Sequence, residues 1–390
     1  MKKSWNFWES LKRCFPIAAV EFGILCGPSM ASGAYATNYF SKWGPQGIWM
    51  ILFWMLLMVV SVFCGMYFAS AFGVHNYSEF YREMYGKKIY KFAAPVLDIY
   101  ALFGGIIAEA AQCTLGGVMF NTLFGWHPLV GASLMAIVII VLMLWGDEIV
   151  RRGAAIMTFV LLAGFAILLF YAINIRGGVI AEYLGNYNLY EEWGVGKLSV
   201  GFWTVFLYAL SCMPCPTTLC NINQKQQPGV GDALMIAILT PILVGLLFFV
   251  NFIITIGFAP ESLAQSTPNL YIVTEHIKTG WVNFIYYFVM FFALASSGPG
   301  LTYNIVNRFG PLLFKKSKLS KVAINGITAV IFNVICVAFS TVGLTAIITK
   351  GFTTMGKIAG PLIVAPMVLT TVPRAYKKLK ADKAAESSNE

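Results

Sequence analysis

Long apolar runs that carry no Asp, Glu, Lys or Arg dominate the chain. They lie at 43–78, 127–146, 153–175, 198–224, 233–260, 279–307 and 322–349. A helix needs about 20 apolar residues to cross a hydrocarbon core of about 30 Å. Only 11% of the residues are charged and the mean hydropathy is +0.73, whereas about 25% of a soluble domain is charged. The pattern excludes a soluble globular protein and predicts a polytopic membrane protein.

Shorter or interrupted runs at 14–41, 92–123 and 351–373 raise the predicted number of membrane helices to ten. These helices are expected at 14–40, 46–72, 92–122, 127–146, 153–175, 199–222, 233–258, 281–307, 322–346 and 353–374. The chain then divides into a cytoplasmic N-terminus at 1–13, a first five-helix repeat at 14–175, an extracytoplasmic loop at 176–198, a second five-helix repeat at 199–374 and a cytoplasmic tail at 375–390.

The distribution of basic residues predicts the orientation. Lysine and arginine collect in the cytoplasmic loops of membrane proteins. With ten crossings, 21 of the 27 basic residues fall on the side of the two termini. The six on the opposite side are Lys42, Arg176, Lys197, Lys278, Lys350 and Lys357. We therefore expect a multi-pass protein of the cell (inner) membrane with both termini in the cytoplasm.

Two of the expected helices contain helix-breaking residues in the middle of the span. The first contains the run from Gly27 to Gly33, with Pro28 inside it, and the sixth contains Pro214 and Pro216. Proline removes a backbone donor and clashes with the preceding turn. A simple proline kink is one explanation. The alternative is an open break, whose freed backbone groups cost several kcal/mol in lipid unless they line a cavity or bind something.

Both breaks fall in the first helix of a five-helix half. Interrupted helices in matching places are typical of secondary transporters built from inverted repeats, which bind their substrate near the middle of the membrane. In such sites half-helix N-termini attract anionic groups, and freed carbonyls coordinate a cation. The sequence therefore predicts a carrier with a site beside the breaks of its first and sixth helices.

The stretch GPSMASGAYATNYFSKWGPQG, which begins at Gly27, resembles the first-helix signature of the YkvI family of bacterial membrane proteins. FLYAL from Phe206 and the hydroxyl pair Ser296–Ser297 also resemble that family. The family belongs to the APC superfamily. The resemblance implies an all-α membrane protein of ten helices, with a LeuT-like 5+5 inverted repeat and broken helices 1 and 6.

The resemblance also implies a cation site. In sodium-coupled members of this fold, the eighth helix supplies a carbonyl and two adjacent hydroxyls, which meet two carbonyls of the broken first helix. Carried over to this chain, the ligands are Gly27, Met30, Ala293, Ser296 and Ser297. Hard cations take oxygen ligands, so Na⁺ is the expected coupling ion. The alternative is that the hydroxyls only bond to carbonyls of their own helix.

The third helix carries a carboxyl group near the bilayer centre. Asp98, Gly105, Glu109, Gln112 and Gly116 share one helix face. A charge at that depth costs at least about 2.5–3.5 kcal/mol, so Glu109 is a candidate to bind a cationic group or to carry a coupling proton. It could instead be a protonated group that bonds to a neighbouring helix. Glu21 is a weaker candidate, because Lys12 or Arg13 could pair with it.

The expected function is secondary active transport of a small organic solute such as an amino acid, coupled to Na⁺ or H⁺. The expected partners are that solute and the lipid bilayer, without nucleic acid, a bound cofactor or an enzymatic activity, and the oligomeric state is left open. The expected substrate-binding residues are Ser29, Ala31, Ser32, Gly33, Glu109, Cys113, Tyr208, Ser211, Cys212 and Thr217.

The alternative function is transport of a soft transition-metal ion. Thiolate and thioether ligands select Cu⁺ or Zn²⁺, and Cys212, Cys215, Met213 and Met30 flank the two breaks. Buried cysteine is also an ordinary packing residue. A channel or a membrane sensor would share the broken helices, whereas no nucleophile–base arrangement that would indicate an enzyme is visible in the sequence.

Overall fold

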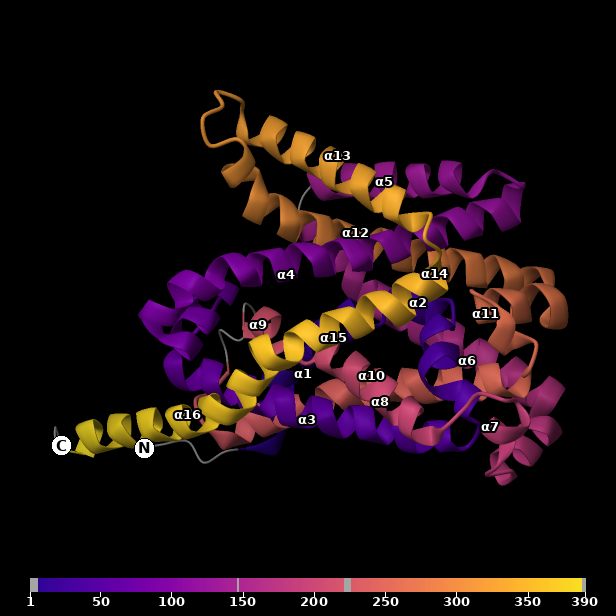
Figure 1. The fold of residues 1–390 in the computed structure, drawn as a ribbon, viewed down its shortest axis with the longest axis horizontal. Helices are drawn as coiled ribbons and strands as arrows, with labels where there is room; N and C mark the ends of the chain where they lie inside the picture. The colour runs from indigo at the N-terminus through magenta and orange to yellow at the C-terminus, as the bar shows by residue number, and fades with distance from the viewer. Residues whose placement is uncertain (1–5, 146, 221–225, 388–390) are drawn as a thin grey trace.

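A computed structural model describes residues 6–145, 147–220 and 226–387 of the chain. In these residues all regular secondary structure is helical (Figure 1). The helices of the first half are α1 (Phe7–Leu25), α2 (Pro28–Ala31), η1 (Ala36–Phe40), η2 (Ser41–Trp43), α3 (Gln46–Phe72), α4 (Tyr77–Phe124), α5 (Pro128–Trp145), α6 (Asp147–Gly185) and α7 (Leu189–Glu192).

The second half begins with α8 (Leu198–Cys212), α9 (Pro216–Leu219), α10 (Val230–Gly257), η4 (Ser262–Ala264), α11 (Pro268–Tyr271), η5 (Ile272–Ile277) and α12 (Gly280–Leu313). It ends with α13 (Lys321–Ser340), α14 (Leu344–Ala346), η6 (Ile347–Phe352), α15 (Thr353–Ala359), η7 (Gly360–Val364) and α16 (Ala365–Ser387). By length and composition, 8 helical segments of the described chain could cross a membrane, and α5 is a shorter apolar helix. With α1 added, the arrangement is compatible with the predicted ten crossings.

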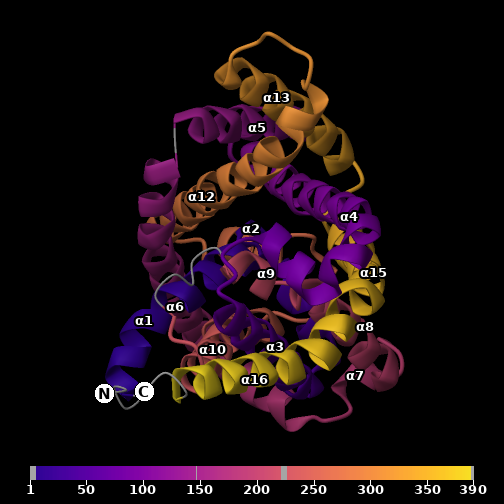
Figure 2. The ribbon, with the colours of Figure 1, turned by 90° about the vertical axis from the view of Figure 1, so that its left-hand side faces the viewer.

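The long helices form two groups with the broken segments between them. Helices α4, α5, α12 and α13 pack on one another and form the first group, which we call the four-helix group. On the other side, α1, α3, α8 and α10 lie together with α16 (Figure 2). Helix α6 contacts α10 and α12, and so joins the two groups along one flank. The short helices α2 and α9 lie in the middle (Figure 2).

The two predicted breaks are present as open interruptions. The first helix stops at Leu25, resumes at Pro28, and turns again at Gly33, whose φ is +80°. The sixth stops at Cys212 and resumes at Pro216. Helix α9 contacts α1, so the two interruptions are neighbours in space. Figure 1 also shows the start of α1 and the end of α16 at one end of the molecule, with α7 and α11 at the other.

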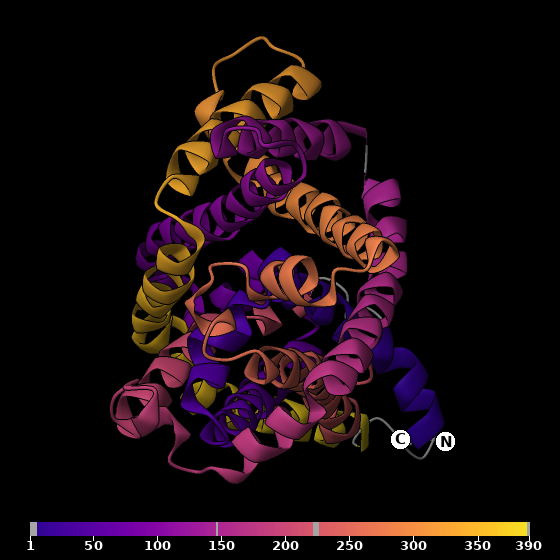
Figure 3. The same cartoon turned by 90° about the vertical axis from the view of Figure 1, so that its right-hand side faces the viewer.

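The chain departs from the expected helix boundaries in several places, among them α16, which continues to Ser387 through the predicted tail. Helix α4 begins at Tyr77, before the expected 92, and is interrupted at Gly86, whose φ is +74°. This first part contains Glu79 and Arg82 and so is not a charge-free run. Helix α6 continues beyond a kink at Arg176. The segment at 259–279, which contains η4, α11 and η5, was not predicted. In Figure 3 it lies across the middle of the view, on the side of the molecule that carries α7.

Candidate functional site

A cavity of about 610 Å³ lies where the broken helices face the four-helix group. Its volume falls within the range of about 300–1,000 Å³ that is usual for small-molecule sites. Side chains from five helical regions line it. They include Glu21 and Leu25 from α1, Tyr81, Tyr100 and Gly105 from α4, Ser211, Cys212, Cys215 and Thr217 from the sixth-helix break, Ile305 and Arg308 from α12, and Met355 from α15.

One part of the cavity wall, which we call its mouth, is formed by the start of α4 and the end of α12, on the side of the molecule where α1 begins (Figure 1). Residues 76–81, at the start of α4, and Arg308, near the end of α12, form part of its wall. The Arg308 guanidinium donates to Asp98 Oδ1 at 2.6 and 3.1 Å and to Ser78 Oγ at 3.1 Å. The two charged side chains are partly exposed. The mouth therefore carries an ion pair whose charges neutralise one another.

Glu21 lies in the cavity wall beside the break of the sixth helix. Its side chain is buried, with 1% of the residue exposed, and it interacts with the Cys215 thiol. Its Oε2 atom has no hydrogen-bond partner among the described residues. Of the two possible partners Lys12 and Arg13, Arg13 binds Asp232 instead: its Nη2 and Nε atoms lie 3.0 Å from the Asp232 carboxylate oxygens.

Stacked aromatic rings surround Tyr208, one helical turn before the cavity residues Ser211 and Cys212 in α8. The Tyr39 and Tyr208 rings stack with centroids 4.2 Å apart, and Tyr35 stacks on Tyr208 at 5.4 Å. Trp54 and Phe352 complete the cluster around Tyr208. Tyr208 was expected to bind the substrate, but it belongs to this cluster and is not among the residues that line the cavity.

The protein itself satisfies the freed backbone of the first break. Ala31 O accepts from Asn269 Nδ2 at 3.0 Å and from Tyr286 OH at 3.1 Å, and Ser32 O accepts from Asn269 N at 2.9 Å. In the sixth-helix break, Ser61 Oγ donates to Met213 O. Unpaired groups in lipid would be costly, so these contacts show how α11, α12 and α3 stabilise the interruptions.

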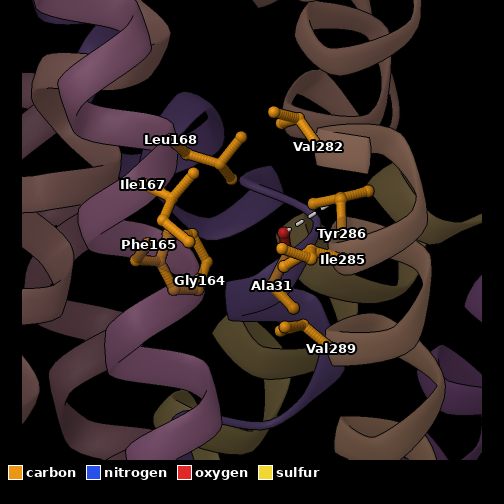
Figure 4. A pocket seen from close by; sticks show the side chains of 9 residues that line it. All are labelled: Ala31, Gly164, Phe165, Ile167, Leu168, Val282, Ile285, Tyr286 and Val289. Atoms are coloured by element: carbon orange, nitrogen blue, oxygen red, sulfur yellow. Dashed lines mark hydrogen bonds between the residues drawn. The ribbon is translucent and has the colours of Figure 1, made fainter. Parts of the chain in front are cut away.

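A narrow crevice between α2, α6 and α12 lies next to this contact (Figure 4). Its walls are apolar side chains such as Phe165, Leu168 and Val289, and the Tyr286–Ala31 hydrogen bond crosses one side of it. The space amounts to about 10 Å³, which is about the room that one water molecule needs. The crevice is therefore too small for an organic solute.

Several of the expected cation ligands already form hydrogen bonds within the protein. Ser297 Oγ lies 2.8 Å from Ala293 O and 3.2 Å from Gln112 Oε1. Gly27 O accepts from the backbone of Met30 and Ala31, and Met30 O accepts from Gly33 N. The Ser296 side chain lies outside the described residues. The hydrogen bond from Ser297 to its own helix agrees with the alternative explanation, in which the two hydroxyls bond only to carbonyls of that helix. The cation site therefore stays a prediction.

Glu109 and Cys113 lie on the side of α4 that faces the other helices of the four-helix group. Glu109 is fully buried, and neither of its carboxyl oxygens has a hydrogen-bond partner among the described residues. Cys113 packs in an apolar cluster with Ile305, Phe332 and Cys336. Neither Glu109 nor Cys113 is among the residues that line the cavity.

Of the ten expected substrate-binding residues, Ser211, Cys212 and Thr217 line the cavity. Ser29, Ala31, Ser32 and Gly33 are buried in the first break, outside its wall. Asp98 and Arg308 line the cavity but were not among the expected ligands. The described residues contain no group of three or more His, Cys, Asp or Glu side chains that could hold a metal ion.

The structure resembles solved structures of transporters. It aligns with a mutant of the manganese transporter of Eremococcus coleocola at 12% identity and TM-score 0.63, over 94% of this chain and 80% of that one. MhsT in complex with L-phenylalanine aligns at 12% identity and TM-score 0.63, over 97% and 99%. A Na⁺-coupled sialic acid symporter aligns at 14% identity and TM-score 0.58, over 95% and 87%.

These likenesses establish the fold: the chain has the LeuT-like architecture, and the predicted fold class is confirmed. No protein-family model matches the sequence, and no curated protein does. Membership of the YkvI family therefore stays a prediction.

Proposed function

We propose that the chain is a secondary active transporter, which moves a small organic solute such as an amino acid by alternating access. The observation that carries this proposal is the cavity of about 610 Å³ beside the two broken helices. The cavity mouth lies on the side of the molecule where α1 begins, and Tyr208, which stacks on Tyr39, lies one helical turn before the cavity residue Ser211. A site beside broken helices is typical of secondary transporters built from inverted repeats. The compared structures are of transporters, which supports transport rather than enzymatic activity.

We propose Na⁺ as the coupling ion, bound between Gly27, Met30, Ala293, Ser296 and Ser297, with H⁺ on Glu109 as the alternative. Transport of a soft metal ion has no support from a ligand cluster among the described residues. We place the protein in the cell (inner) membrane with the cavity mouth toward the cytoplasm, because the mouth lies on the side with most of the basic residues.

Uptake by reconstituted protein tests the proposal. Proteoliposomes are given a mixture of radiolabelled amino acids in Na⁺ or choline buffer, with and without a pH gradient. We expect Na⁺ to stimulate uptake. Ser297→Ala should reduce that stimulation by about tenfold, the equivalent of about 1.4 kcal/mol of cation binding. Ser133→Ala is the matched control, because Ser133 Oγ also donates to its own helix, at Leu129 O, but is exposed.

Other outcomes separate the parts of the proposal. Equal uptake in Na⁺ and choline, unchanged by Ser297→Ala, excludes Na⁺ coupling. A proton carried by Glu109 predicts that Glu109→Gln abolishes accumulation driven by a pH gradient and spares solute exchange. If no labelled amino acid enters under any gradient, the proposed transport function is wrong for this class of solute.

A further inference from the structure

We propose that Glu21 recognises the transported solute, and that this solute carries a protonated amino group. The inference rests on the proposed function and adds the chemical class of the substrate and the residue that selects it. Three observations carry it: the unmatched carboxyl oxygen of Glu21, the charge of the cavity wall, and the hydrogen-bonding capacity of the side chains beside Glu21.

The carboxyl groups of Glu21 and Asp232 are both buried, but they differ in the hydrogen bonds that their oxygens accept. Asp232 accepts from Ser10 Oγ at 2.6 Å, from Arg13 at 3.0 Å and from Gln227 N at 2.9 Å. Glu21 Oε2, in contrast, has no partner among the described residues. A buried polar atom without a partner costs about 1–3 kcal/mol, and more for a charged group. A ligand that supplies a donor would remove this cost.

Two buried carboxyl groups in the described part of the chain have oxygens without a partner, and of these Glu21 lies in the cavity wall. Glu109 is 0% exposed and lies near Cys336 of the four-helix group, outside the cavity wall. Glu21 belongs to that wall, together with Leu25 of its own helix and Met355 of α15. Glu21 is therefore part of the cavity wall, and because its Oε2 atom is buried, the side chain has to rotate before a solute can bind to it.

The charge of the cavity wall favours a cationic ligand group. Three charged residues line the cavity, and two of them, Asp98 and Arg308, pair with each other at 2.6 Å. No Lys, Arg or His in the described part of the chain forms an ion pair with Glu21. The wall thus offers one carboxyl group that no basic side chain pairs with, and an ammonium group beside it would favour its ionised form.

The neighbouring hydroxyls accept hydrogen bonds but have no donor to spare. Ser211 Oγ donates to Tyr208 O at 2.6 Å, and Thr217 Oγ1 donates to Pro214 O at 2.8 Å. A hydroxyl has a single donor hydrogen and two lone pairs, so each presents only acceptor capacity to the cavity. An ammonium group has three donors and no acceptor. An ammonium group can therefore donate to the Glu21 carboxyl group and to acceptors of the same cavity wall, whereas a carboxylate cannot donate to either.

Ligand binding to the purified full-length protein tests the assignment without a transport assay. The probes are the common L-amino acids and the α-hydroxy acids with the same side chains, compared by thermal shift and calorimetry. We expect one or more amino acids to bind and the matched hydroxy acids to bind more weakly. Glu21→Gln should weaken amino-acid binding by about 10- to 100-fold, as the loss of a charged hydrogen bond implies. It should also remove the preference for the amino form.

Two further variants make the result specific. Glu21→Asp keeps the charge and should retain the preference for amino acids with an intermediate affinity. Glu9→Gln changes a carboxyl group on the same helix whose side chain is 51% exposed, and should leave binding unchanged. If Glu21→Gln misfolds, the Glu21→Asp variant alone decides the question by its affinity and its preference.

The assignment is overturned if Glu21→Gln binds amino acids as tightly as the unmodified protein does. It is also overturned if hydroxy acids bind equally well, or if no amine in the panel binds. Amino-acid binding that depends on Glu21, together with no uptake into proteoliposomes, would contradict the proposed transport function and leave this assignment standing. Uptake that does not depend on Glu21 would contradict only the assignment.

Discussion

Gly33→Ala is expected to destabilise the protein by about 2–4 kcal/mol and to abolish most of its transport. Gly33 has a φ of +80°, a conformation that costs an L-residue about 1–2 kcal/mol. A Cβ atom here would also lie 2.6 Å from Asn269 Oδ1, and overpacking costs about 1–3 kcal/mol. Asn269 bonds to Ala31 and Ser32, so its displacement would release the first break. Thermal denaturation and size-exclusion chromatography in detergent measure the loss.

Gly343→Ala is the matched control for this prediction. Gly343 has a φ of +90°, but nothing lies within 4 Å of its added Cβ atom. Gly343→Ala should therefore show only the destabilisation of about 1–2 kcal/mol that a positive φ causes for an L-residue. A second substitution, Asn269→Ala, should make the effect of Gly33→Ala smaller than in the unmodified protein, because residues in contact are not additive. Equal losses for Gly33→Ala and Gly343→Ala would show that Asn269 does not hold the break.

Asp232→Asn is expected to cost about 1–3 kcal/mol, because the buried Asp232 carboxylate loses its charged hydrogen bonds while the Arg13 side chain, which is 19% exposed, stays partly solvated. The Asp232 side chain is 0% exposed, and its carboxylate accepts from Arg13, Ser10 and Gln227. These bonds join α1 to the start of α10, so their loss should loosen the first half-helix. Chemical denaturation of the purified protein, followed by tryptophan fluorescence, gives the change.

Asp382→Asn is the matched control, because it removes an ion pair that has a similar N–O distance but is exposed to solvent. Lys378 Nζ lies 2.8 Å from Asp382 Oδ1, and the two side chains are 45% and 47% exposed. Exposed pairs contribute about 0–1 kcal/mol, so this variant should be nearly neutral. Adding Arg13→Met to Asp232→Asn should recover part of the loss, since no unpaired charge then remains. A small effect of Asp232→Asn would mean that the hydrogen bonds between α1 and α10 contribute little to the free energy of unfolding.

Most of the helices could be predicted because lipid imposes a simple rule on the sequence. A span must be apolar over its whole length, and this rule located helices such as α3 and α10. It failed where helices extend into water: the start of α4 contains Glu79 and Arg82, and α6 continues beyond Arg176. The hairpin at 259–279 is held by tertiary contacts such as Asn269 with Ser32, for which the sequence carries no local signal.

The site could be predicted only in part, because contacts between distant segments decide it. The prolines indicated both breaks, and the wall residues Ser211, Cys212 and Thr217 followed from their position in one of them. The sequence offers Arg13 as a partner for Glu21 two turns away, but in the fold Arg13 binds Asp232, which lies 219 residues further along the chain. Helical spacing placed Glu109 on one face of its helix, but only the fold shows which neighbour that face contacts.

The accessibility of Cys212 from the two sides of the membrane tests the central claim most directly. The variant retains Cys212 and carries serine at the other cysteines, and a membrane-impermeant thiol reagent is added to inside-out or right-side-out vesicles. A cavity in the sixth-helix break that opens toward the cytoplasm predicts labelling at least about tenfold faster in inside-out vesicles, the ratio expected when the opposite access state is a minor one. Labelling from neither side, in protein whose Cys212 reacts fully after denaturation in detergent, would contradict the account.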